Sequence, residues 1–82
     1  MHRDLPPLPS DRAVSAMAAF IADMDRAQDL PSLELHFHRA GAYLAALNDV
    51  QAISGASLQG CTLVLDSLYR EHSRRLGSLD LL

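Results

Sequence analysis

The sequence predicts an all-α fold, and two features of its 82 residues support that prediction. Apolar residues recur at spacings of three and four in three separate segments, which is the pattern of helices that bury one face. Proline, glycine and capping residues separate these segments, and no segment alternates apolar and polar residues as a half-buried strand does. We therefore expect a small three-helix bundle or, if the last two segments are continuous, an extended helical hairpin.

The chain opens with a proline-rich arm, followed by the first helical segment. Prolines at three of the four positions 6–9 lack N–H donors and hold their predecessors extended, so residues 1–10 are predicted to form an extended arm. Ser10 offers an N-cap oxygen and Asp11 a first-turn carboxylate, which predicts a helix over residues 11–28. Its apolar face holds Ala13, Val14, Met17, Ala18, Phe20, Ile21 and Met24.

The second helical segment follows a break at residues 29–32. Asp29 and Ser32 are capping residues, and Pro31 is tolerated only in the first turn of a helix. These residues predict a second helix over residues 32–53. Its main apolar arc holds Leu33, Phe37, Ala40, Tyr43, Leu44, Leu47 and Val50.

A second, narrower apolar stripe lies nearly opposite this main arc. A helix with two apolar faces is usually covered on both, either by neighbouring helices or by a second copy of the chain. Because symmetric pairing is the commonest soluble assembly, we expect a homodimer. The dimer interface is expected either at the exposed part of the third helix or at this stripe, which consists of Leu35, Ala42, Ala46 and Ile53.

Residues 54–57 indicate the next break. Gly55 can take the left-handed position that ends a helix, and Ser57 can cap the helix that follows. The alternative is a helix that continues through the break, with a row of small residues that allows close approach of another helix. That row would hold Ala52, Ala56 and Gly60.

The third helix is expected over residues 58–76 and has the strongest periodicity in the chain. Gly77 is expected to end it, so the helical domain would span residues 11–77 and leave residues 78–82 as a short apolar tail. Leu63 departs from the pattern because it projects on the polar side. The apolar arc holds Leu58, Cys61, Val64, Leu65, Leu68, Tyr69, His72 and Leu76.

Composition restricts the compartment and the classes of partner. The single cysteine excludes an intramolecular disulfide, no secretory leader is recognisable, and no apolar run approaches the roughly 20 residues of a membrane span, so we expect a cytoplasmic protein. A net charge of −3 disfavours nucleic acid, because duplex binders usually carry a basic face. The alternative function, a nucleic-acid-binding regulator, would use the arginines at the end of the third helix, Arg70, Arg74 and Arg75.

The sequence offers no constellation typical of an enzyme or a metalloprotein. His36 and His38 would point about 200° apart on a helix, so they would not share a metal ion. Cys61 and His72, considered together with Asp66, would lie about three helical turns apart, too far for direct proton transfer. We therefore expect no catalysis, no metal and no cofactor.

The arm contains the most specific short pattern in the chain, in residues 3–9. Arg-Asp-Leu-Pro-Pro-Leu-Pro resembles the proline-rich ligands of SH3 domains. The resemblance implies that Leu5-Pro6 and Leu8-Pro9 would fill two aromatic-lined grooves while Arg3 meets an acidic pocket. Packing of this apolar arm over its own bundle is the favoured interpretation.

Surplus apolar surface predicts a protein that binds another protein. Three short helices cannot bury the second-helix stripe, the outlying leucine and the leucine-rich tail against one another. We expect a non-enzymatic regulator, inhibitor or adaptor that works as a homodimer. Its expected partner-binding residues are Leu63, Leu79, Leu81 and Leu82.

Overall fold

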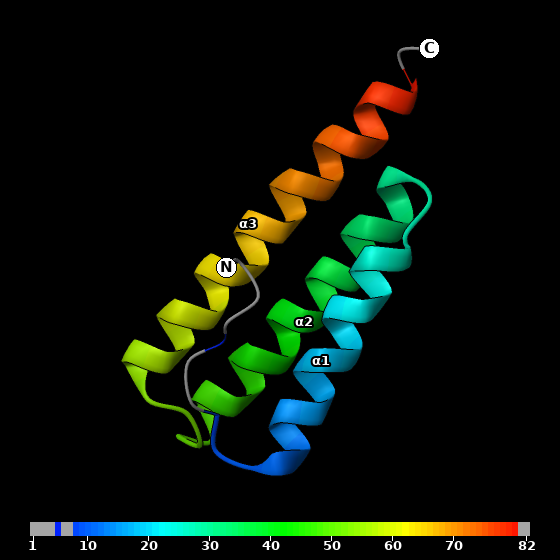
Figure 1. The fold of residues 1–82 in the computed structure, drawn as a ribbon. Helices are drawn as coiled ribbons and strands as arrows, with labels where there is room; N and C mark the ends of the chain where they lie inside the picture. Colours follow the sequence, from blue (N-terminus) through cyan, green and yellow to red (C-terminus); the bar gives the residue numbers. More distant parts are fainter. Residues whose placement is uncertain (1–4, 6–7, 81–82) are drawn as a thin grey trace.

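The computed structural model describes residue 5 and residues 8–80, and three helices fill most of that part of the chain (Figure 1). Helix α1 spans Asp11–Arg26, α2 spans Leu30–Asp49 and α3 spans Gly55–Asp80; the described residues contain no strand. Contacts of α2 with each neighbour are more extensive than those between α1 and α3. The predicted three-helix bundle is therefore confirmed, and the alternative of one continuous second and third helix is not formed.

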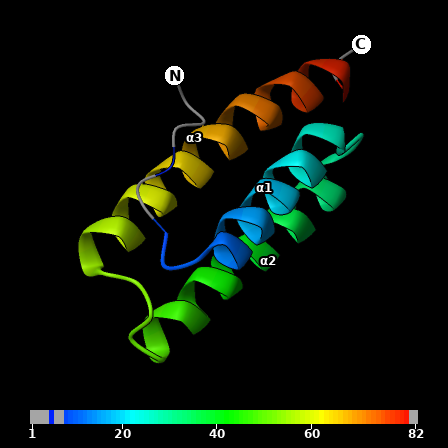
Figure 2. The same cartoon turned by 60° about the horizontal axis from the view of Figure 1, so that its bottom comes forward.

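The bundle is elongated, with extents of 45 × 22 × 18 Å. The turned view shows the three helices running roughly along the same direction, each antiparallel to the one before it (Figure 2). Because α3 is the longest helix, its C-terminal end extends beyond the turn that joins α1 to α2 (Figure 1).

Side-chain caps begin the first two helices. The Ser10 hydroxyl accepts a hydrogen bond from the Ala13 N–H at 3.1 Å, as its predicted N-cap role requires. The Asp29 carboxylate accepts from the Ser32 N–H at 2.8 Å, and Pro31 lies in the first turn of α2. Helix α2 therefore begins at Leu30, before the predicted position, because Asp29 is the residue that caps it.

Helix α2 ends in a Schellman motif centred on Gln51, which has a left-handed φ of 55°. The Ala52 N–H donates to the Leu47 carbonyl at 2.8 Å, and the Gln51 N–H donates to the Asn48 carbonyl at 3.0 Å. The prediction that Gly55 takes the left-handed position is wrong, because the helix ends several residues earlier. Because α2 ends at Asp49, Val50 is not part of the helix. It is 73% exposed and does not belong to the main apolar arc on which the sequence predicts it.

Helix α3 is longer at both ends than predicted. The Ser54 hydroxyl accepts from the Ser57 N–H at 3.1 Å, so Ser54 caps the helix and Ser57 lies within it. Gly77 does not end the helix: no described glycine has a positive φ, and an interior glycine costs only about 1 kcal/mol relative to alanine. Residues 78–80 are therefore helical, not a tail, and residues 81–82 lie outside the described part.

The core runs along the shared axis of the three helices. Two aromatic pairs join α2 to its neighbours, with ring centroids 5.7 Å apart for Phe20 and Tyr43 and 4.6 Å apart for Phe37 and Tyr69. The largest fully buried side chains are Met17, Met24, Leu33, Leu44, Cys61 and Leu68.

Candidate protein-binding surfaces

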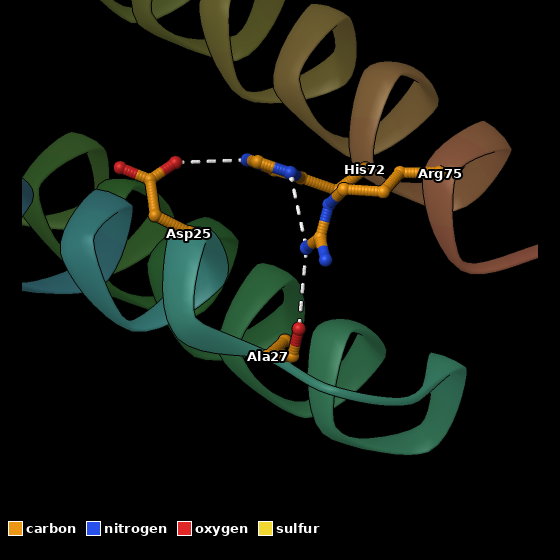
Figure 3. A network of polar contacts seen from close by, with 4 residues as sticks. All are labelled: Asp25, Ala27, His72 and Arg75. Carbon is orange, nitrogen blue, oxygen red and sulfur yellow. Dashed lines mark hydrogen bonds and ion pairs between the residues drawn. The ribbon is translucent and has the colours of Figure 1, made fainter. Parts of the chain in front are cut away.

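A polar network crosses from α3 to the end of α1 near the α1–α2 turn (Figure 3). Nε2 of His72 lies 2.8 Å from an Asp25 carboxylate oxygen, although the His72 residue is only 9% exposed. The Arg75 guanidinium donates to the Ala27 carbonyl at 3.2 Å and lies 3.4 Å from Nδ1 of His72. The network therefore joins side chains of α3 to both a side chain and a backbone carbonyl at the end of α1.

The chemistry of this network is structural. A guanidinium has only N–H donors, so Nδ1 of His72 accepts from Arg75 while Nε2–H donates to Asp25. A histidine oriented by a carboxylate is common in active sites, but here the second ring nitrogen faces an arginine instead of a nucleophile. We therefore assign Asp25, His72 and Arg75 to holding α3 against α1.

The outer face of α3 is defined by Leu63, Ser67, Arg70, Glu71 and Arg74. Among the α3 residues whose side chains the structure describes, Leu63 is the most exposed large apolar residue. Leu63 is 61% exposed, as its place outside the apolar arc predicts. One turn further along, the other four residues line a hollow of about 320 Å³. Arg70 and Arg74 are exposed and have no ion pair or hydrogen bond within the described residues.

The structure does not bring the three predicted arginines into one basic patch. Arg75 turns toward the core side and contacts Ala27 and His72, whereas Arg70 and Arg74 belong to the outer face. These arginines are also not in the last turn of the helix, because α3 continues to Asp80. The outer face thus has two available arginines with Glu71 beside them, which is a weak basic surface.

The outer face of α2, defined by Leu35, Ala42 and Ala46, carries the predicted dimer stripe. All three residues are exposed, and Leu35 is 48% exposed. Ile53 does not belong to this face, because it follows the end of α2 and lies in the core at 8% exposure. The helical periodicity that placed Ile53 on the stripe stops at the left-handed turn of Gln51.

The two histidines of the H-x-H pair point to different surroundings. His36 is half-buried beside α1, with Nδ1 3.8 Å from an Asp23 carboxylate oxygen and no hydrogen-bond partner among the described residues. His38 is exposed and lies against Phe37. Across residues 5 and 8–80, no three histidine, cysteine or acidic side chains gather as they would around a metal ion.

Cys61 and His72 lie about three turns apart on α3, and Cys61 is fully buried in the core. Burial raises the pKa of the Cys61 thiol by desolvation, so the neutral form is favoured. Asp66 lies on the half-exposed flank of the same helix. These positions give Cys61 the surroundings of a packing residue and not of an activated nucleophile.

Two leucines of the proline-rich arm pack on the bundle. Leu5 and Leu8 are half-buried against the core cluster, and Leu5 lines a largely apolar hollow with α1 residues that include Val14 and Ile21. This placement supports packing of the arm over its own bundle, because these leucines are the residues that an SH3 domain would need to bind. Arg3, Pro6 and Pro7 of the SH3-like pattern lie outside the described residues.

The remaining predicted partner-binding residues are at the C-terminal end of the chain. Leu79 is in the last described turn of α3, and Leu81 and Leu82 lie outside the described part. None of the described helices combines the length and the apolar character that crossing a membrane requires. No family model, curated protein or solved structure matches the chain.

Proposed function

We propose that this chain is a small helical protein that binds another protein through the outer face of α3, as a cytoplasmic regulator, inhibitor or adaptor without a reaction of its own. The observation that carries the proposal is the 61% exposure of Leu63 within an otherwise polar face. A leucine moved from water into a partner's groove contributes roughly 1.5–3 kcal/mol, whereas an exposed ion pair contributes less than about 1 kcal/mol. An apolar contact at Leu63 is therefore the strongest binding contribution that this surface offers.

Nucleic-acid binding is the weaker candidate for the same surface. Affinity for a phosphate backbone grows with the number of phosphates that basic side chains neutralise. With Arg75 engaged by Ala27 and His72, only Arg70 and Arg74 face outward here, and Glu71 lies between them.

Site-specific photo-crosslinking in the native host tests the protein-binding proposal. A photoreactive phenylalanine analogue replaces Leu63 in one variant and Ser15, an exposed residue of α1, in the control. We expect discrete protein adducts from position 63 and none from position 15. The proposal fails if position 63 gives no adduct, or if both positions give the same adducts.

The proposed assembly is a homodimer that pairs the outer faces of α2. Leu35 at 48% exposure and the exposed Ala42 and Ala46 lie on one side of α2, and the two alanines are small enough for a second helix to approach closely there. The mass of the chain in solution tests this assembly, and a monomeric mass at all accessible concentrations would rule it out.

A further inference from the structure

The hollow on the outer face of α3 has the form of a socket for another helix. It is lined by Ser67, Arg70, Glu71 and Arg74, which occupy positions i, i+3, i+4 and i+7. In helix pairs that pack knobs into holes, four residues on one helix form the hole that receives a side chain from the facing helix. Ser67, at one end of this hollow, is small and leaves room for such a side chain.

The same face continues as a seam with alternating spacings of three and four. Gly60 and Leu63 precede Ser67, and Arg70 and Arg74 follow it, so the seam advances by seven residues over every two helical turns. Positions with this spacing stay on one side of a helix, where they can follow a partner helix along its length, and Leu63 is the large apolar residue among them. The seam is opposite the buried arc of α3, so no helix within the described residues covers it.

The charged residues on the outer face of α3 indicate which kind of helix can bind there. Arg70 and Arg74 are exposed and have no ion pair within the part of the chain that the structure describes, whereas the chain as a whole carries a net charge of −3. Their long apolar stems can flank a knob while the guanidinium groups reach acidic residues of a partner. Arg70 and Arg74 flank one carboxylate, Glu71, so this face suits a helix whose acidic residues lie opposite the two arginines alone better than a uniformly charged phosphate backbone.

We infer that the outer face of α3 binds an acidic amphipathic helix of another protein, with one apolar side chain in the Ser67 hollow, a second beside Leu63, and carboxylates opposite Arg70 and Arg74. This inference rests on the proposed function and adds the class of partner. It requires three features of one face together: the hole, the exposed leucine and the unpaired arginines.

An NMR titration of the full chain tests the inference with defined probes. The first probe is a synthetic helix of about three heptads with leucines along its seam and glutamates beside them; the second has lysines in place of the glutamates. A third probe is a short DNA duplex. We expect the acidic helix to shift backbone amide signals of residues 59–74, with little effect from the basic helix or the duplex.

Matched variants assign the effect to the seam. Leu63→Ser should weaken binding of the acidic helix about tenfold, and a combined Arg70→Gln and Arg74→Gln variant should weaken it about fivefold. Binding of the acidic helix to the wild type should also weaken as the salt concentration rises. Arg12→Gln, which changes an exposed arginine of α1, should leave binding unchanged. These results together would support the acidic-helix inference.

Four outcomes would overturn it. These are equal binding of the acidic and basic helices, no binding of the acidic helix, stronger binding of the duplex, and shifts of residues 59–74 on raising the protein concentration alone. The last outcome would show a second copy of the chain on the seam. Adducts at position 63 in the crosslinking experiment would still uphold the proposed function, so failure of the partner class and failure of protein binding are distinguishable.

Discussion

The imidazole ring of His72 is buried, so both of its nitrogens need hydrogen-bond partners. Its neighbours are Asp25 at 2.8 Å and Arg75 at 3.4 Å, and the same guanidinium reaches the Ala27 carbonyl at the C-cap of α1. A carbonyl at a helix C-terminus has no partner within the helix, so Arg75 satisfies a group that would otherwise need water. The Arg75 side chain therefore links the end of α1 to α3.

We expect Arg75→Gln to lower the free energy of unfolding by about 1 kcal/mol, the typical net value of one hydrogen bond. The shorter amide removes the guanidinium from both Ala27 and His72. Arg74→Gln is the matched control, because Arg74 makes no hydrogen bond or ion pair within the described residues, and it should change stability by less than about 0.5 kcal/mol. Urea denaturation measures both, and equal losses would contradict the role assigned to Arg75.

Cys61 gives a prediction about alkaline pH. Burial raises the pKa of its thiol, so between the pKa values of the unfolded and folded states the unfolded chain ionises first. The stabilising contribution of the neutral buried thiol is fully present below the unfolded pKa and is lost as the pH rises through the folded pKa. The stability of the wild type relative to Cys61→Ala should therefore fall with rising pH in that window. A pH-independent difference in urea denaturation would contradict this.

The polar network shows which parts of a site a sequence of this kind can predict. Periodicity places His72 on the apolar arc of α3, and the structure confirms its burial at 9% exposure. Its partner Asp25 is 47 residues away, and Ala27 is 48 residues from Arg75. Spacing rules relate only neighbours along one helix, so these contacts follow from how α1 and α3 pack and could not be predicted.

At the scale of elements, the starts of α1 and α2 are more predictable from the sequence than the ends of α2 and α3. Ser10 and Asp29 have side-chain oxygens that fix a start through one short-range hydrogen bond. The end of α2 depends on Gln51 adopting a left-handed conformation that glycine would adopt more readily, and no local preference indicates this. Gly77 shows the converse, because it lies within α3 although glycine is common at helix ends.

The left-handed φ of 55° at Gln51 gives a test of this interpretation. A side chain in that conformation costs roughly 1–2 kcal/mol, part of which glycine regains despite its greater flexibility in the unfolded chain. Gln51→Gly should therefore raise the free energy of unfolding by about 0.5–1 kcal/mol.

Gln59→Gly is the matched control, since Gln59 is exposed within α3. There the same substitution should lower stability by about 1 kcal/mol, the usual penalty of glycine in a helix. Thermal and urea denaturation measure the change in stability of both variants and its sign. If Gln51→Gly were as destabilising as Gln59→Gly, the Schellman motif would not be the end of α2.

For the whole molecule, the order of the helices determines which faces remain open. Helix α2 packs against both α1 and α3, and its third side presents Leu35, Ala42 and Ala46. The proline-rich arm covers part of α1 through Leu5, and it leaves the outer faces of α2 and α3 uncovered by the described residues. The two faces lie on different helices, so the proposed dimer through α2 would leave the proposed partner-binding face of α3 accessible.

The dimer is tested by a charge placed in the middle of the α2 face. In a two-fold interface each substitution occurs twice, so Ala46→Asp would put two carboxylates into an apolar contact without compensating partners. We expect light scattering to give twice the 8.9 kDa of one chain for the wild type and a single-chain mass for Ala46→Asp. Far-UV circular dichroism should be unchanged, because Ala46 is exposed within one chain. Ser15→Asp, on the exposed side of α1, is the control and should leave the dimer intact. Loss of the dimer in both variants would indicate a general effect of charge and would contradict the α2 interface.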